Sequence, residues 1–313
     1  IDLAIGCERE ALEADRRITN SDGALVSTYS GSHWYANSND FIGGWDWSTH
    51  SVDCAVIAAD SAGMQRDGWY TKHRNPLQLE SARAVGRQAG ERTVARLGAR
   101  RLTTRRAPVI FEAPVASGLF SAFVGAISGG ALYRKASFLL DRLGTEVFAP
   151  HLRIHEQPHL KCALGSAPFD SDGMATRPRD LIQAGVLQGY VLDAYSARKL
   201  GLEPTGNGGG VHNLSVEPGA QDLPALLHAM GTGLLITDMI GFGVNQVTGD
   251  YSRGASGFWV ENGAICYPVE EITVAGNLLD IYKNIIAVGT DVDWRGNVLT
   301  GSVLIDGLTI AGE

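Results

Sequence analysis

The chain has 313 residues, of which 44% are hydrophobic and 19% charged, and its formal net charge is −8. This composition is typical of a soluble globular protein of about two domains with a sizeable core. The negative charge argues against a general nucleic-acid binder, because such proteins need a basic face to displace counterions from phosphates.

The four cysteines stand far apart, and no CxxC pair occurs among them. This usage favours a reducing compartment over a disulfide framework or a zinc knuckle, and no signal peptide is recognisable. We therefore expect a cytoplasmic protein. Because the chain opens on Ile1 inside a helical pattern, we also expect that a preceding segment is missing.

The first hundred residues show two helical patterns that flank a group of β-type runs. Leu3, Cys7, Ala11 and Ala14 form one face of a first helix, which is predicted to end at the turn cluster 20–23. Runs typical of an antiparallel meander follow at 24–29, 33–36, 51–59 and 64–72, with breaks expected at glycines 31, 43 and 44 and at Ala62-Gly63. A second helical pattern covers 76–97. Residues 1–103 are therefore predicted to form one domain of helix, antiparallel sheet and helix.

An uncharged stretch of 21 residues, 113–133, lies near the middle of the chain. Its large apolar residues recur with the spacing of one helical face: Leu119, Phe120, Phe123, Val124 and Ile127. The other side carries small residues, which would let another backbone approach closely: Ser117, Ser121, Gly125, Ser128 and Gly129. The length would permit a membrane span, but only about a third of the stretch is strongly apolar. We therefore predict a buried helix at the centre of the protein and no association with a membrane.

The second half of the chain is richer in glycine and in β-type patterns. Strands are predicted at 151–156, 244–247, 255–261, 264–267 and 301–310, with hairpins through Gly185 and through Asn262-Gly263. Helical patterns cover 136–143, 222–230 and 277–288. Residues 104–313 are thus predicted to form a mixed, β-rich domain around the Gly- and Ala-rich helix. The whole chain is predicted to be α+β and rich in antiparallel sheet.

Histidines offer the first candidates for metal chemistry. His151, His155 and His159 recur every four residues, but the alternating pattern and the prolines at 150 and 158 indicate a strand. On a strand, neighbouring rings of this set would lie roughly 13 Å apart, too far for one tetrahedral zinc ion. No HExxH motif occurs. Residues 170–173 resemble the start of a calcium loop without its closing glutamate, and we interpret them as a polar turn.

Three further segments invite a functional interpretation. Ser196 and Lys199 satisfy the S-x-x-K pattern without an accompanying KTG, so a hydrolase built on them is a minor alternative. Residues 205–210, TGNGGG, could form an anion nest but lack the lysine of a P-loop, and we interpret them first as a flexible loop. Residues 248–259 combine opposite charges with an aromatic strand and are predicted to be a peptide-docking edge. The residues by themselves show no complete active site.

Four motifs carry a resemblance to a known family: YRKASFLLD at 133–141, YSARKLG at 195–201, TGDYSRGASGFWVENG at 248–263 and PVEEITVAGNL at 268–278. They resemble the TldD/PmbA metallopeptidase family, formerly described as modulators of DNA gyrase. The resemblance covers nearly the whole chain. It implies a middle domain followed by the family's C-terminal domain, with the family's N-terminal domain absent from this chain.

The resemblance also bears on the missing chemistry. TldD proteins carry an HExxxH motif on the segment that corresponds to the central helix, and a downstream cysteine as the third zinc ligand. At the corresponding positions this chain has Ser121, Ala122 and Ala126, and residues 296–302 contain no cysteine. Metal ligands and general base are therefore both missing, and zinc hydrolysis needs both. The resemblance thus implies no catalytic residue, metal ligand or cofactor in this chain.

The resemblance therefore implies a metal-free subunit, of the PmbA (TldE) type, in a cytoplasmic two-chain metallopeptidase that cleaves unfolded peptides. A TldD-like partner would supply the zinc ion, so that proteolysis is expected only in the complex. The alternative is a non-enzymatic, homodimeric protein that binds peptides or acts as a scaffold. Candidate residues for peptide binding or for the interface are Ser121, Gly125, Gly129, Asp250, Tyr251, Ser252 and Arg253.

Overall fold

The computed structural model describes residues 1–61 and 63–312. These residues form an α+β protein rich in antiparallel sheet, as predicted. The chain divides into two compact units. We call them the central unit (residues 1–34, 44–100 and 162–164) and the C-terminal unit (residues 35–43, 101–161 and 165–313).

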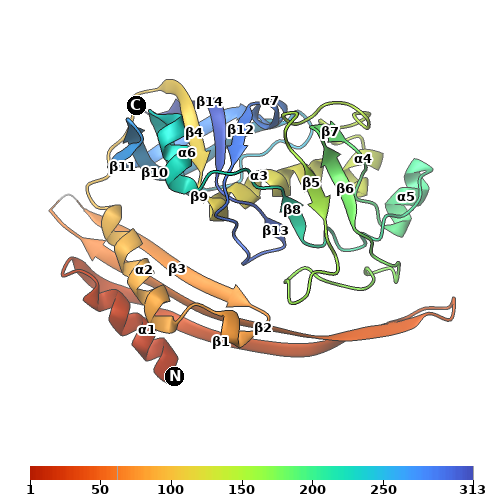
Figure 1. The fold of residues 1–313 in the computed structure, drawn as a ribbon, viewed down its shortest axis with the longest axis horizontal. Helices are drawn as coiled ribbons and strands as arrows, with labels where there is room; N and C mark the ends of the chain where they lie inside the picture. Colours follow the sequence, from red (N-terminus) through yellow and green to blue (C-terminus); the bar gives the residue numbers. More distant parts are fainter. Residues whose placement is uncertain (62, 313) are drawn as a thin grey trace. The chain divides into compact units, whose positions relative to one another are not determined.

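The central unit is a three-stranded sheet with two helices. Its elements are α1 (Asp2–Glu13), β1 (Ile18–Ala36), β2 (Ile42–Ala59), β3 (Met64–His73), a 3-10 turn (Pro76–Gln78) and α2 (Ala82–Ala95). The strands lie in the order β1-β2-β3, and α1 and α2 lie side by side against the sheet (Figure 1). Alternate residues of β2, from Val52 to Ala58, are buried with Cys7 and Ala11 of α1 in one apolar cluster. The predicted helix–meander–helix pattern is confirmed.

Two glycines allow α1 and α2 to pack closely. A Cβ atom at Gly86 would lie 2.0 Å from the carbonyl oxygen of Cys7, and one at Gly90 would lie 2.8 Å from that of Ala11. Any side chain at these two positions of α2 would therefore force the helices apart, because backbone cannot yield at such distances.

The glycines expected to break the meander are instead inside long strands. Gly31 lies within β1, and Gly43 and Gly44 lie within β2. At Gly31 and Gly44 the bare backbone is covered by an indole ring, because Cβ atoms there would lie 3.1 Å from Trp47 and 2.5 Å from Trp34. The predicted end of the first helix was also wrong: α1 ends at Glu13, and residues 20–23 belong to β1. Of the predicted break at 62–63, residue 62 is outside the described residues.

The C-terminal unit contains two sheets. The elements of the larger sheet are β4 (Arg105–Phe111), β9 (Gly233–Ile240), β10 (Asp250–Glu261), β11 (Ala264–Asn277), β12 (Ile285–Val288) and β14 (Val303–Ala311), in the order β11-β10-β9-β4-β14-β12. Its first strand also pairs with β14, from Thr273↔Ala311 to Ala275↔Thr309, so that the sheet closes on itself. The smaller sheet contains β5 (Ile154–Glu156), β6 (Arg179–Gln183), β7 (Val186–Leu187), β8 (Leu214–Val216) and β13 (Val298–Leu299), in the order β13-β8-β5-β6-β7.

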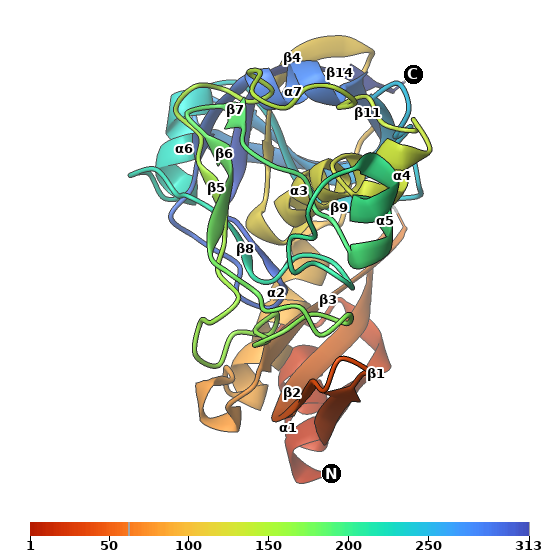
Figure 2. The same ribbon diagram turned by 90° about the vertical axis from the view of Figure 1, so that its right-hand side faces the viewer.

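Five helices complete the C-terminal unit among the described residues: α3 (Ala113–Ala126), α4 (Gly129–Tyr133), α5 (Ala194–Leu200), α6 (Leu223–Met230) and α7 (Leu278–Lys283). Figure 2 shows α4 and α5 next to each other, and α3 close to β9. Val109 and Phe111 of β4 pack into the main core with α3, whereas Ile110 points to the other face and packs under α6. This alternation places α3 and α6 on opposite faces of the same strand.

The predicted central helix is two helices. α3 ends at Ala126, and Ser128 starts α4 because its hydroxyl accepts a hydrogen bond from the amide of Ala131 and donates one to the carbonyl of Gly125. Burial of Leu119, Phe120 and their apolar neighbours confirms a buried helix face. None of the helices in the described part of the chain is both long and apolar enough to cross a membrane.

Other predictions for this half were right about turns and less accurate about element types. Both hairpin turns are confirmed, with left-handed backbone at Ala184-Gly185 and at Asn262-Gly263. The helix predicted at 222–230 is α6, capped by Asp222. In contrast, the pattern at 277–288 divides into α7 and β12, and residues 136–143 and 244–247 form neither a helix nor a strand. The strand predicted at 151–156 begins only at Ile154.

Candidate functional site

One side of α3 is not covered by the core. Ser121 is exposed and Ser117, Gly118 and Gly125 are half-buried, whereas Leu119, Phe120 and Phe123 on the other side are buried. That buried side is held in place by Tyr282, whose hydroxyl donates a hydrogen bond of 2.9 Å to the carbonyl of Leu119. We call Ser117, Gly118, Ser121 and Gly125 the open side of α3. The core fixes the rotation of the helix and so determines which residues are open.

Two polar side chains from elsewhere in the chain lie against the open side of α3. The amide nitrogen of Gln246 donates a hydrogen bond of 3.2 Å to the carbonyl of Ala122 and would lie 2.8 Å from a Cβ atom at Gly125. The guanidinium of Arg253 would lie 3.7 Å from a Cβ atom at Gly118. The sequence analysis predicted that a second backbone would approach Gly125, and this was wrong. A side chain approaches it, from the loop that precedes β10.

Both side chains contain a buried polar atom with no hydrogen-bond partner among the described residues. These atoms are Oε1 of Gln246, an acceptor, and Nε of Arg253, a donor. Burying a polar group without a partner costs roughly 1–3 kcal/mol, and such groups are rare in folded proteins. Two of them lie against one helix, which makes the open side of α3 the candidate site.

Tyr251 lies next to Arg253 and hydrogen-bonds to it. Burial raises the pKa of Tyr251 to about 12, although the positive charge of Arg253 opposes the shift. The phenol is therefore neutral at ordinary pH and can act as a hydrogen-bond donor or acceptor, not as a base.

The four candidate residues of β10 divide between the two faces of the strand. Tyr251 and Arg253 point toward α3, because successive side chains alternate. Asp250 and Ser252 are exposed on the other face, where the Asp250 carboxylate accepts a hydrogen bond of 2.7 Å from Thr248. The predicted docking edge was wrong as well. β11 pairs along one side of this segment, and on the other the amide of Ser252 donates to the carbonyl of Gly243 at 2.7 Å.

The residues at the positions that correspond to HExxxH do not fit a metal ion. The Ser121 hydroxyl donates to the carbonyl of Ser117 at 2.9 Å, and Ala122 and Ala126 are buried alanines. Across residues 1–61 and 63–312, no three His, Cys, Asp or Glu side chains are grouped so that they could hold a metal ion. His155 contacts Gln157, and His159 contacts the hydroxyl of Thr176 at 3.0 Å, so these histidines have separate environments.

Gly129 lies directly against the side chain of Ser196, which leaves no room for a Cβ atom at this position. A Cβ atom at Gly129 would lie 2.1 Å from the hydroxyl oxygen of Ser196, which is 2% exposed. That hydroxyl donates to the carboxylate of Asp193 at 2.6 Å, as part of the cap that starts α5, and the ammonium of Lys199 lies over the ring of Tyr195. Gly129 is thus a contact between α4 and α5. Asp193 is the N-cap of α5, and Ser196 belongs to this cap because its amide and its hydroxyl both donate to the Asp193 carboxylate.

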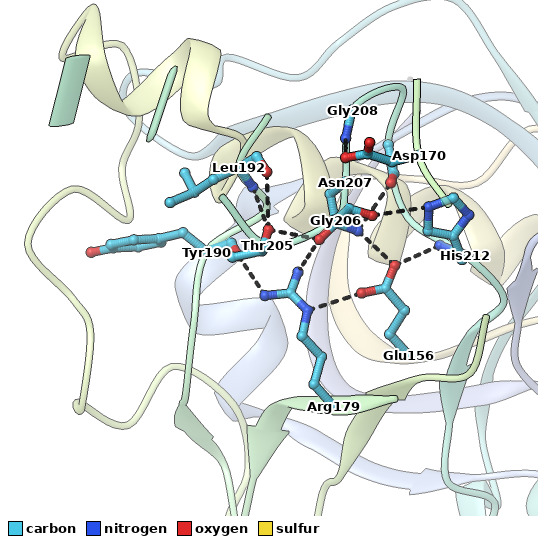
Figure 3. Close-up of polar contacts among 11 residues, drawn as sticks. Glu156, Asp170, Arg179, Tyr190, Leu192, Thr205, Gly206, Asn207, Gly208 and His212 are labelled. Atoms are coloured by element: carbon cyan, nitrogen blue, oxygen red, sulfur yellow. Dashed lines mark hydrogen bonds and ion pairs between the residues drawn. The ribbon is translucent and has the colours of Figure 1, made fainter. Parts of the chain in front are cut away.

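A second polar cluster, which the sequence analysis missed, contains Glu156, Arg179 and Asn207 (Figure 3). The carboxylate of Glu156 is 2% exposed and accepts hydrogen bonds from Arg179 (3.0 Å), the Asn207 side chain (2.7 Å) and the amide of His212 (2.6 Å). The other guanidinium nitrogens of Arg179 donate to Asn207 and to the carbonyl of Tyr190.

Residues 205–210 are therefore not a flexible loop. Asn207 is 4% exposed and joins the Glu156–Arg179 ion pair, and the amide of Gly208 donates to the buried carboxylate of Asp170 at 2.7 Å. One backbone amide of the glycine-rich segment, that of Gly208, does bind an anion, but this anion is the Asp170 carboxylate of the same chain. Only the tertiary structure brings Glu156, at the end of β5, to this loop.

Comparison with known proteins gives the class and then the family. The model of the PmbA/TldA metallopeptidase central domain matches residues 1–97, and that of the PmbA/TldA metallopeptidase C-terminal domain matches residues 104–312. The chain thus consists of the central and the C-terminal domain of a metallopeptidase class. It belongs to the PmbA/TldD metallopeptidase family.

Individual relatives support this placement. Metalloprotease PmbA of Escherichia coli O157:H7 is 47% identical over 313 residues, which are all of this chain and 70% of that protein. A crystal structure of a putative modulator of DNA gyrase from Bacteroides thetaiotaomicron superposes with a TM-score of 0.95 at 29% identity, covering 100% of this chain and 71% of the other. TldE from Thermococcus kodakarensis has the same fold, with a TM-score of 0.89 at 20% identity over 99% of this chain and 74% of its own.

Proposed function

We propose that this chain is the metal-free subunit of a two-chain, cytoplasmic peptidase and that the open side of α3 helps to bind an unfolded peptide. A TldD-type partner would supply the zinc ion. The observation that carries the proposal is the pair of unpartnered polar atoms, Oε1 of Gln246 and Nε of Arg253. They lie against a helix that has Ser121, Ala122 and Ala126 at the positions corresponding to the metal ligands and the general base.

The two atoms match the chemistry of a peptide main chain. Every peptide unit offers an N–H donor and a C=O acceptor, so the acceptor of Gln246 and the donor of Arg253 complement it without reading side chains. Gly118 and Gly125, which mark the two places on α3, are seven residues apart, or about 10 Å along a helix. An extended peptide covers this distance with about three residues. Both side chains are only half-buried, so rotation of their terminal torsions can present the atoms to a ligand.

The chain's own residues then have a binding role and no chemical step. No group on the open side of α3 can hold a metal ion or act as a general base, since Ser121 is a hydroxyl bonded to Ser117 and Tyr251 is a neutral phenol. In a shared complex, the zinc ion of the partner would activate the water, and Arg253 and Gln246 would hold the peptide in an extended form.

The test is to measure cleavage of an unstructured peptide by this chain, by a TldD-type protein encoded with it, and by the mixture. We expect cleavage only by the mixture. Elemental analysis of this chain alone should find no stoichiometric zinc, because Ser121 and Ala126 stand at the two histidine positions and residues 296–302 contain no cysteine. Two results would contradict the proposal: equal cleavage by this chain alone, or full activity of the partner alone.

One tightly held zinc ion per chain, lost on mutation of His151, His155 or His159, would also contradict it and return attention to those histidines. Peptide binding by a homodimer, with no dependence of cleavage on a partner, would favour the non-enzymatic alternative. Complex mass, measured for each chain and for the mixture, distinguishes these outcomes from a simple failure of the two chains to associate.

A further inference from the structure

The sheet of the central unit has one face against α1 and α2 and a second face that carries a groove. Val52 and Cys54 of β2 pack under the two helices, and the residues that alternate with them, Ser51 and Asp53, belong to the second face. The groove has a volume of about 560 Å³ and is lined, among others, by Tyr29, Thr49, Asp53, Tyr70 and Lys72. We call it the sheet groove. Its volume is within the range of small-molecule sites, about 300–1,000 Å³.

Two opposite charges line the sheet groove without pairing with each other. Asp53 is half-buried and Lys72 is exposed, and within residues 1–61 and 63–312 neither side chain makes a hydrogen bond or an ion pair. In the register of β2 and β3, Asp53 lies opposite Tyr70 and Ser51 opposite Lys72. The acid and the base are therefore diagonal neighbours on one face, which places them about 7–8 Å apart. Burial raises the pKa of Asp53, as expected for a carboxylate partly withdrawn from water.

The sheet groove also contains a hydroxyl and two aromatic rings that can bind a ligand. Oγ1 of Thr49 is buried and has no hydrogen-bond partner among the described residues. The side chains of Tyr29 and Tyr70 are 61% and 39% exposed. Tyrosine rings with a free face pack well against a second aromatic ring. The groove thus combines a negative charge, a positive charge, a free hydroxyl and an aromatic surface.

We propose that the sheet groove is a binding site for a zwitterionic dipeptide with an aromatic side chain. Its ammonium group pairs with Asp53 and its carboxylate with Lys72. An extended dipeptide spans roughly 7 Å, at about 3.3–3.6 Å per residue, which matches the spacing of the two diagonal neighbours. The peptide group then lies between the charges, where Thr49 can complete its hydrogen bonding, and the aromatic side chain packs on a tyrosine ring.

The pair of charges selects this class of ligand over simpler ones. An ion of one sign would leave either Asp53 or Lys72 unpaired. A free amino acid has its two charges too close together to reach both side chains, and a longer extended peptide places them too far apart. The ligand needs neither the open side of α3 nor a partner subunit, so this site is independent of the proposed peptidase role.

The test is isothermal titration calorimetry of the purified chain with glycyl-tyrosine at neutral pH. The matched probes are N-acetyl-glycyl-tyrosine, which lacks the ammonium group, and glycyl-tyrosine amide, which lacks the carboxylate. We expect each modification to weaken binding about 10-fold or more, because each removes one charge-assisted contact. Free tyrosine should also bind more weakly than the dipeptide.

Variants assign each charge of the ligand to one residue. Asp53→Asn should bind glycyl-tyrosine and its N-acetyl form equally, and Lys72→Met should bind glycyl-tyrosine and its amide equally. The control is Asp46→Asn, because Asp46 is exposed on the same strand but already accepts a hydrogen bond of 2.5 Å from Ser32. This variant should keep both preferences.

The probes are compared within each variant, so a small loss of folded protein does not change the result. Three outcomes would overturn the proposal: no binding of glycyl-tyrosine by the unaltered chain, equal binding of all three probes by that chain, or an ammonium preference that survives in Asp53→Asn.

Discussion

Two polar clusters of the C-terminal unit differ in whether all their buried polar atoms have hydrogen-bond partners. In the cluster of Glu156, Arg179 and Asn207, the carboxylate, the guanidinium and the amide all have partners (Figure 3). On the open side of α3, Gln246 and Arg253 each have a buried atom with none. Both clusters join segments that are far apart in the sequence, and both contain an arginine.

Whether its hydrogen bonds are satisfied within the chain determines the role of a buried polar residue. A cluster that satisfies its own hydrogen bonds needs no ligand, and removing one member leaves the others buried and unpaired. A cluster with free hydrogen-bonding capacity already carries that cost, so removing a member affects stability little but weakens what binds there. The predictions below test this contrast, beginning with the largest effect.

The largest loss of stability is expected for Glu156→Ala. The change leaves the guanidinium of Arg179, whose side chain is 20% exposed, without its carboxylate, and takes an acceptor from Asn207 and His212. Breaking such a buried pair costs about 3–5 kcal/mol. Urea unfolding measures the loss. Arg153→Ala is the matched control, because its pair with Asp180 is 46% exposed on the arginine side and should contribute no more than about 1 kcal/mol. Equal losses in the two variants would contradict the contrast.

Arg253→Ala should have the opposite profile. We expect a smaller loss of unfolding free energy than for Glu156→Ala, about 1 kcal/mol, because only the hydrogen bond to Tyr251 is lost. Cleavage by the mixed complex should fall about 10- to 100-fold, since a hydrogen bond to a charged group contributes about 1.5–3 kcal/mol. Gln246→Ala should reduce cleavage less, by about 2- to 10-fold, because its bond is neutral. The zinc content of the complex should not change. Ser252→Ala, on the other face of β10, is the control, and a loss of cleavage there would remove the distinction between the faces.

The two glycines offer a smaller and purely steric comparison. Gly129→Ala places a methyl group 2.1 Å from the Ser196 hydroxyl inside the α4–α5 contact, and overpacking of this kind costs about 1–3 kcal/mol. Gly125→Ala meets only the end of the flexible Gln246 side chain, 2.8 Å away, and should cost less. It should nevertheless lower cleavage by displacing Gln246. Thermal unfolding of both variants checks the order, and the reverse order would be incompatible with these neighbours.

The smallest effect concerns pH. Burial, and then the charge of Arg153, lower the pKa of His155, while Asp180 and Glu217 act in the opposite direction. The unfolded chain therefore takes up a proton at a higher pH than the folded chain does, so stability falls as the pH drops below about 6.5. His155→Gln should make stability less dependent on pH in that range. Denaturant unfolding at several pH values measures the slope, and identical slopes in the two proteins would rule out this histidine as the source.

Features that depend on neighbouring residues could be predicted from the amino-acid sequence. The positive φ required at Asn262-Gly263 and Gly185, the capping residue Asp222 and the apolar period of Leu119, Phe120 and Phe123 predicted two turns and two helices correctly. The motifs at 133–141, 195–201, 248–263 and 268–278 were enough for the family. Local conformational rules decide such features, because the interactions that enforce them lie within a few residues.

Which polar groups meet, and which remain without partners, depends on the packing of distant segments. The pattern at 277–288 is apolar at helical spacing, yet Ile285–Val288 pairs with β14 as a strand, because strand pairing outweighs a weak helical preference. Gln246 reaches α3 from a loop more than a hundred residues away, and Glu156 meets Asn207 across 51 positions. No local pattern records such contacts, since they follow from how the sheets and helices pack, and the candidate site consists of them.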